Sequence, residues 1–153
     1  MPQYVTKSIK QLNHKLQKKQ HEPYPSTPII YGAKKQYATP QTNATLLDRK
    51  VKKFIHKMCG EFIFLGRASD STLLCPISAI ASNSATAIGD TMKQTQQILD
   101  YIAIQEESEL TFKASDMKLA TYSDASYFSE LKSCSRAGGH LFLSRNSNIM
   151  QKN

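Results

Sequence analysis

The acids are the first residues in this sequence whose type and spacing could do chemistry. Asp124 lies within the stretch LATYSDASYFSELKSCSRAGGHLFLS, whose first alternating run predicts a β-strand with this acid at its end. Carboxylate oxygens are the ligands that Mg²⁺ prefers, and its near-octahedral geometry needs several of them to converge. The only later acid is Glu130, in a predicted polar turn, and Asp116 is in another turn. Asp124 is therefore a candidate catalytic and metal-binding residue without an evident partner.

The second group of candidate residues is cationic. Lys50, Lys52, Lys53 and Lys57 fall within eight residues, and Arg136 follows in the predicted turn. Lysine and arginine total 13 against 3 acids in residues 1–67, but 7 against 9 in residues 68–153. Basic side chains that meet phosphates release condensed counterions, so this asymmetry favours nucleic-acid binding. A solvated lysine-rich face that only maintains solubility is an equally open interpretation.

The cysteines and histidines do not have the spacing of a zinc site or a disulfide framework. They are Cys59, Cys75, Cys134, His14, His21, His56 and His140. No run approaches the roughly 18 apolar residues of a membrane span, and the N-terminus lacks the apolar core of a secretory signal. We therefore expect an intracellular protein, cytoplasmic or nuclear and not secreted, with free thiols and no membrane partner.

Four stretches have the apolar period of a helix. Residues 4–19 form the first, and the prolines that follow predict an irregular connector over residues 21–43. Residues 47–65 form the second, with the lysines opposite its apolar face. Asp70 or Ser71 is expected to cap a shorter helix, and Asp90 or Thr91 a further one. The expected core residues are Val5, Ile9, Leu12, Leu16, Leu47, Val51, Phe54, Ile55, Met58, Phe62, Leu65, Leu73, Leu74, Ile77, Ile80, Met92, Leu99, Ile102 and Ala103.

Beyond Glu109 the apolar period shortens to two residues, which predicts strands at LTFKA, MKLATYSDA and AGGHLFLSR. Gly138 and Gly139 indicate a bulge or a close backbone approach at the start of the third strand. The expected fold class is α+β, with helices followed by a small antiparallel patch of three strands.

The block SDASY…SRAGGH, with the acid-bearing strand before it, resembles the start of the ribonuclease H domain in copia-type LTR retrotransposon Pol polyproteins. Upstream segments resemble, in the same order, the region between the polymerase palm and that domain. They are MPQYVTKSI, YGAKKQYA, LLDRKVKKFI, CGEFIFLGRASDSTLLCPISAIAS and TMKQTQQILDYIA. The resemblance covers residues 1–147. It departs from the family near Tyr122, Leu131 and Cys134, where histidine, proline and a basic residue are expected.

The resemblance implies a domain division and a cofactor. Residues 1–108 would be the thumb- and connection-like helices at the C-terminal end of the reverse transcriptase, and residues 109–153 the first strands of an incomplete, truncated ribonuclease H-like domain. That family cleaves RNA in RNA–DNA hybrids with two divalent metal ions. Asp124 matches one of the metal ligands, but one acid cannot hold a pair of Mg²⁺ ions. We therefore expect Asp124 to be vestigial and no Mg²⁺ to be bound by this chain alone.

The family's polymerase metal site is also missing from the sequence. Its palm motif, an aromatic residue followed closely by two aspartates, does not occur, and Glu106–Glu107 is the only pair of adjoining acids. The expected function is that of a polyprotein segment that is inactive alone and binds RNA–DNA hybrid or duplex weakly. Other polyprotein segments are its expected protein partners. Two alternatives stay open: a non-enzymatic protein-interaction module, and a nuclease that completes its metal site with another chain.

Overall fold

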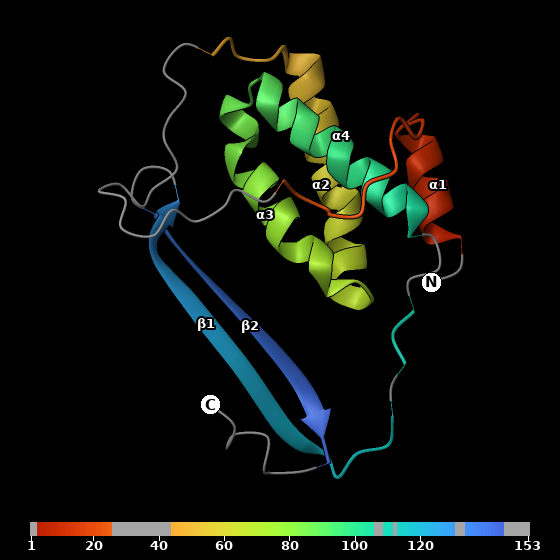
Figure 1. The fold of residues 1–153 in the computed structure, drawn as a ribbon, viewed down its shortest axis with the longest axis vertical. Helices are drawn as coiled ribbons and strands as arrows, with labels where there is room; N and C mark the ends of the chain where they lie inside the picture. Colours follow the sequence, from red (N-terminus) through yellow and green to blue (C-terminus); the bar gives the residue numbers. More distant parts are fainter. Residues whose placement is uncertain (1–2, 26–43, 106–108, 112, 131–133, 146–153) are drawn as a thin grey trace. The chain divides into compact units, whose positions relative to one another are not determined.

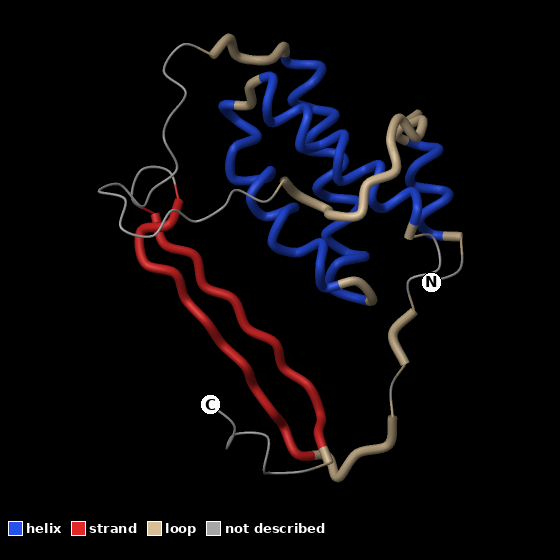
Figure 2. Tube along the Cα trace, in the orientation of Figure 1, coloured by secondary structure: helices blue, strands red, loops and turns tan. Residues whose placement is uncertain are grey.

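The computed structural model describes residues 3–25, 44–105, 109–111, 113–130 and 134–145. The chain divides into two compact units (Figure 1). Residues 1–28 and 43–110 contain the helical unit, and the described part of the second unit is a β-hairpin. Figure 2 shows this segregation of helix and strand. The predicted α+β class is therefore confirmed at the level of mixed helix and antiparallel sheet.

The first helix, α1 (Tyr4–Gln11), is half as long as the sequence pattern predicts. Val5 and Leu12 are buried as expected, at 3% and 6% exposure. Leu16 was also expected on the buried face of a helix over residues 4–19, but it lies beyond the helix and is 48% exposed. The prediction of helix and burial beyond Leu12 is therefore wrong.

A Schellman turn ends α1. Asn13 has a left-handed backbone, with φ of 51°, and asparagine is second only to glycine in tolerating this conformation at a helix end. The N–H of Asn13 donates to the carbonyl of Lys10 over 3.0 Å, and the N–H of His14 donates to that of Ile9 over 3.2 Å. The chain is thereby turned out of the helix although the apolar spacing continues.

The second helix, α2 (Arg49–Ala68), is the one that the sequence indicates most clearly. Asp48 caps it by accepting a hydrogen bond from the N–H of Lys50. The residues predicted for its core face are buried or packed against the core, as a stripe of helical period requires. They are Leu47, Val51, Phe54, Ile55, Met58, Phe62 and Leu65.

A 3₁₀ turn, Ser71–Leu73, leads into α3 (Leu74–Asn83). Asp70 caps this turn through the N–H of Thr72, at 3.1 Å, as one of the two predicted caps. Pro76 lies in the first turn of α3, where its missing N–H breaks no helical hydrogen bond. The expected helix is thus present, with a tightened beginning.

The last helix described, α4 (Gly89–Ile104), has a different cap from either residue predicted. Ile88 occupies the cap position, because the hydroxyl of Thr91, three residues on, accepts its N–H at 3.2 Å. Thr91 therefore acts from the third helical position rather than as the cap. Leu99 and Ile102 are buried as expected, and Ile98 joins them at 0% exposure.

Two glycines of α2 differ in what surrounds them, and this gives a stability prediction. A methyl group at Gly60 would meet no atom within 4 Å, whereas at Gly66 it would lie 3.0 Å from Leu74 Cδ2. Because alanine is the better helix former, Gly60→Ala is expected to stabilise the helical unit by about 0.5–1 kcal/mol. In urea unfolding followed by far-UV circular dichroism, Gly66→Ala should show no such gain. Equal gains at both positions would contradict the close packing of α2 on α3.

The hairpin pairs β1 (Lys118–Glu130) with β2 (Cys134–Ser144). Asp124 lies in the middle of β1, opposite Gly138, and not at a strand end as predicted. Backbone pairing continues to the last residue of β1. The prediction of a long polar turn after Asp124 is therefore wrong. The described residues of segment 110–114 are in no strand, so the first of the three predicted strands is absent from them.

Of the two alternatives expected at Gly138 and Gly139, the bulge is not present, and a Cβ at Gly139 would lie 3.5 Å from the carbonyl oxygen of Tyr122, an ordinary contact distance. Both glycines are in regular register, opposite Asp124 and Ser123, and the irregular pairing lies between Ser126 and Glu130. The hairpin exposes leucines on one face and carries a row of aromatic rings on the other. The leucines are Leu119, Leu141 and Leu143, and the row is Tyr122, His140 and Phe142. In the part of the chain that is described, no helix combines the length and apolar character needed to cross a bilayer.

Candidate functional site

Asp124 lies on an exposed face of the hairpin, and His140 lies on the same face, diagonally across the strands from it. Its carboxylate accepts a hydrogen bond from the N–H of Ala125 at 2.9 Å. Within the described residues, no three histidine, cysteine or acidic side chains come together as a metal site would need. The side chain of Glu130 lies outside the described set. As placed here, the Asp124 carboxylate is a surface group held by its neighbouring backbone.

Arg136 shares the face of the hairpin that carries Asp124. It lies opposite Ser126, whose hydroxyl donates to the Arg136 carbonyl at 3.3 Å, and so stands diagonally across the strands from Asp124. Its side chain is half-buried. The four candidate lysines belong to the helical unit and not to the hairpin.

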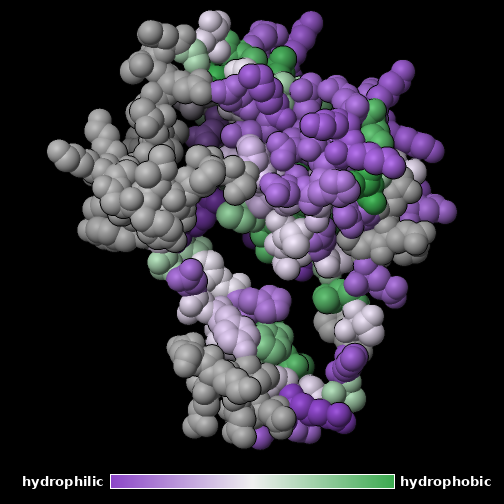
Figure 3. Space-filling view, in the orientation of Figure 1, coloured by the Kyte–Doolittle hydropathy of each residue, from purple (hydrophilic) through white to green (hydrophobic). Residues whose placement is uncertain are grey.

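Three of these lysines form one row along α2. Lys50, Lys53 and Lys57 follow each other at steps of three and four residues and are all exposed, which places them on one side of the helix. Lys52 is about 160° away from Lys50 around the axis and is half-buried. The prediction of a four-lysine face therefore reduces to a row of three, hereafter the lysine row, with Lys52 apart. Figure 3 shows hydrophilic side chains gathered over the helical unit on the face in view.

Helix α1 contacts α2 beside the lysine row through a few hydrogen bonds. The hydroxyl of Tyr4 donates to the Glu61 carbonyl at 2.7 Å, and that of Ser8 donates to the Glu61 carboxylate at 3.3 Å. Further along, Lys57 Nζ donates to the carbonyl of Gln11 at 3.4 Å. These contacts are hereafter the α1–α2 seam. They follow α1 toward its C-terminal end and α2 toward its N-terminal end. A cation at the C-terminal end of α1 also meets the negative end of that helix's dipole.

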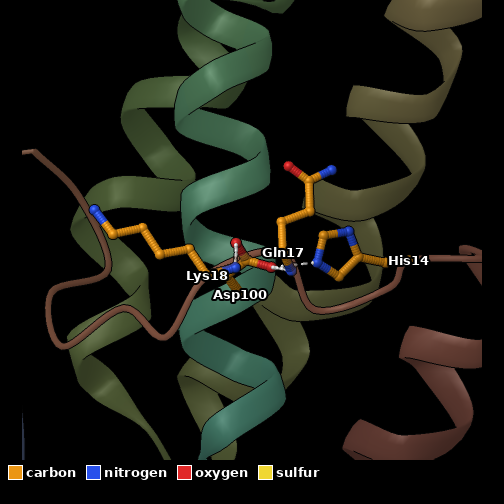
Figure 4. Close-up of polar contacts among 4 residues, drawn as sticks. All are labelled: His14, Gln17, Lys18 and Asp100. Carbon is orange, nitrogen blue, oxygen red and sulfur yellow. Dashed lines mark hydrogen bonds and ion pairs between the residues drawn. The ribbon is translucent and has the colours of Figure 1, made fainter.

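A buried polar cluster, which sequence reasoning missed, joins α4 to the segment after α1 (Figure 4). Asp100 Oδ1 lies 2.8 Å from His14 Nε2, and the two side chains are 4% and 6% exposed. The same oxygen accepts the N–H of Gln17 at 3.0 Å, and Oδ2 accepts that of Lys18 at 3.1 Å. One carboxylate thus fixes three groups of residues 12–25, hereafter the strap.

The arrangement around Asp100 is that of a structural clamp. Two of its three partners are backbone N–H groups that are outside any helix or strand, and a buried N–H without an acceptor is costly. The strap has a further polar contact with α4, from Gln97 Nε2 to the carbonyl of Glu22, at 3.1 Å. The sequence signal for this cluster was Asp100 itself, an acid within the apolar stretch of the last predicted helix. Nothing in the sequence indicated which groups its carboxylate would bind.

Two other groups resemble parts of a nucleophilic site but are held in structural roles. His56 Nε2 lies 2.8 Å from Ser84 Oγ, and that hydroxyl donates to the carbonyl of Ala81 at 2.6 Å. The serine proton is therefore directed at the backbone and not at the imidazole. Burial raises the pKa of the Cys59 thiol to about 11, so at neutral pH this cysteine is protonated and is a poor nucleophile or metal ligand.

Comparisons with protein-family models, with curated proteins and with solved structures found no match to this chain. The resemblance to copia-type polyproteins therefore stays a prediction from sequence motifs.

Proposed function

We propose that this chain binds nucleic acid, as RNA–DNA hybrid or duplex, through the lysine row of α2. The observation that carries the proposal is that Lys50, Lys53 and Lys57 are all exposed on one side of one helix. Such a row brings several cations to a phosphate backbone at once, and each contact releases counterions. A lysine-rich face kept only for solubility needs no such alignment.

The family resemblance gives this binding a context. In the proposal, the helical unit is the thumb- and connection-like part of a copia-type reverse transcriptase, and the hairpin is the start of its ribonuclease H-like domain. Catalysis is not assigned to this chain alone, because Asp124 belongs to no group of three or more histidine, cysteine or acidic side chains among the described residues. Other segments of the same polyprotein would be its natural partners.

A salt titration tests the binding. The full chain is mixed with a dye-labelled RNA–DNA hybrid, and the dissociation constant is measured by fluorescence anisotropy at several salt concentrations. Three phosphate contacts should give a slope of log affinity against log salt of about −2.7 or steeper. An affinity that does not change with salt would rule out phosphate-driven binding.

The lysine row also makes a prediction at residue level. Replacing Lys50, Lys53 and Lys57 together with glutamine should make the salt slope shallower by about 2 to 3, because each lysine accounts for about 0.9. Lys52→Gln is the matched control: it removes one charge from the same helix but lies off the row, so its slope should stay close to that of the wild type. If Lys52→Gln changed the salt slope by as much as each lysine of the triple variant does, only the net charge of the chain would matter for binding.

Hybrid cleavage separates this proposal from an active nuclease. With Mg²⁺ or Mn²⁺ the purified monomer should cleave RNA in the hybrid no faster than buffer does, because a pair of metal ions needs several converging carboxylates. If another chain completes the site, cleavage should appear at high protein concentration and vanish in Asp124→Asn. That result would replace the proposal of an inactive chain with one of an assembled nuclease.

A protein-interaction module is the second candidate, and the hairpin favours it. Leu119, Leu141 and Leu143 lie on one face and are 67%, 64% and 49% exposed. A two-stranded hairpin is marginally stable by itself, and exposed apolar patches often mark interaction sites. Purification of the tagged chain with and without nuclease treatment discriminates the two functions. A discrete protein partner that survives the treatment and is lost in Leu141→Ser, with no nucleic acid retained in the untreated sample, would support this module over the lysine row.

A further inference from the structure

The lysine row is followed on α2 by an exposed aromatic ring. Phe64 lies seven residues beyond Lys57, which is about two helical turns and the same side of the helix. It is 54% exposed. The ring of Tyr4 supports it from one side, with a centroid distance of 5.7 Å, and the Tyr4 hydroxyl is itself fixed by the Glu61 carbonyl. A partly supported, partly open aromatic ring next to a row of cations is a combination that holds unpaired bases.

Helix α1 adds cations along the same seam. Gln11 contacts Lys57 of α2, and Lys7 lies one turn before Gln11 on the same side of α1. Lys7 is exposed and directly precedes Ser8, whose hydroxyl donates to the Glu61 carboxylate, so α1 carries a cation next to a residue of the seam. The α1–α2 seam therefore has basic side chains on both of its helices.

Glu61 determines which part of a nucleic acid can lie between these cations. Its half-exposed carboxylate lies on α2 between Lys57 and Phe64 and accepts a hydrogen bond from Ser8 at 3.3 Å. A phosphate at that point would meet a like charge, whereas a base is neutral. A duplex keeps the faces of its bases stacked inside, so no base face is free to stack on the ring, but a single strand can turn a base onto it.

We propose that the α1–α2 seam binds single-stranded nucleic acid, with phosphates at the lysine row and Lys7 and one base stacked on Phe64. This inference depends on the nucleic-acid binding proposed above and names the form that the seam prefers. A strand that passes Glu61 with a base rather than a phosphate avoids the repulsion that a duplex backbone meets there.

The test compares two forms of nucleic acid and two neighbouring side chains. Binding of the full chain to a dye-labelled 12-nucleotide oligothymidylate is measured beside binding to the same strand annealed to its RNA complement. Phe64→Leu keeps an apolar residue but removes the ring, and should weaken single-strand binding at least fivefold, about the lower end expected for one stacked base. Hybrid binding should change less than about twofold, since it uses phosphates alone. Ile63→Ala, at 37% exposure about 100° around the helix, is the control and should change neither.

Lys7→Gln supplies a second variant that does not alter packing, because the side chain is exposed. It should weaken single-strand binding and make its salt slope shallower by about 0.7. If salt-dependent hybrid binding persists but Phe64→Leu and Lys7→Gln leave single-strand binding unchanged, this inference is overturned and the proposed function stands. If neither form binds with a dependence on salt, both are overturned.

Discussion

Replacing Phe62 with alanine is expected to destabilise the helical unit by about 3–5 kcal/mol. Phe62 is 0% exposed and is among the largest fully buried side chains of the core. Its removal loses the transfer free energy of the ring and leaves a cavity that the helices around it can close only in part. Since small domains are stable by about 5–15 kcal/mol, this change removes a large share of the total.

A matched control lies two residues away on the same helix. Phe64 is 54% exposed, and its replacement by alanine loses chiefly the contact with Tyr4, so it should cost less than about 1.5 kcal/mol. Urea unfolding followed by the helical circular dichroism signal measures both variants. Equal losses for the two phenylalanines would contradict the orientation of α2, and with it the placement of the lysine row.

The second large effect is expected at Asp100. Asp100→Ala removes the acceptor of three hydrogen bonds, from His14 and from the backbone N–H groups of Gln17 and Lys18. Hydrogen bonds to charged groups contribute about 1.5–3 kcal/mol each, but the strap can detach and let water reach these donors. The expected net loss is therefore about 2–4 kcal/mol in unfolding free energy.

Detachment of the strap has a readout of its own. Trypsin cleaves after lysine, and Lys15, Lys18 and Lys19 are exposed on the strap, so cleavage there should be faster in Asp100→Ala than in the wild type. Lys93→Ala is the control, because it breaks an ion pair on the same helix whose side chains are 79% and 43% exposed. It should cost less than about 0.5 kcal/mol. If Asp100→Ala behaved like Lys93→Ala, the carboxylate would not be a clamp.

The helices could be predicted where an apolar stripe, a capping residue and a breaker agree. α2 meets this condition: Asp48 caps it, and its buried residues recur at helical steps over its whole length. The end of α1 could not be predicted from periodicity, since Leu16 continues the stripe after the chain has left the helix. The signal there was Asn13, whose left-handed conformation is decided by local hydrogen bonds and not by burial.

In the hairpin, by contrast, local residue preferences predicted less regular structure than is present. Its polar and small residues around Ala125 and Ser126 have little strand preference, so a turn was predicted where pairing in fact continues. Antiparallel register is set by both strands together, and Ala137 and Arg136 provide partners for these residues. Local propensity could not reveal that Asp124 lies in the middle of a strand.

The candidate site was predictable only as a set of residue types. Helical spacing is enough to separate Lys52 from the other three lysines, because a step of two residues turns a side chain to the far side. The approach of α1 to α2, and the contact of Asp100 with the strap, join residues more than 50 positions apart. Contacts over such separations depend on the packing of the whole unit, and no local pattern indicates them.

The most direct test of the lysine row is a residue-resolved measurement of lysine reactivity. The full chain is acetylated briefly, with and without saturating nucleic acid, and the modification of each lysine is quantified by mass spectrometry. Our account predicts protection of Lys50, Lys53 and Lys57, with Lys52 and the exposed Lys93 unchanged. Uniform protection of all lysines, or none at the row, would contradict it.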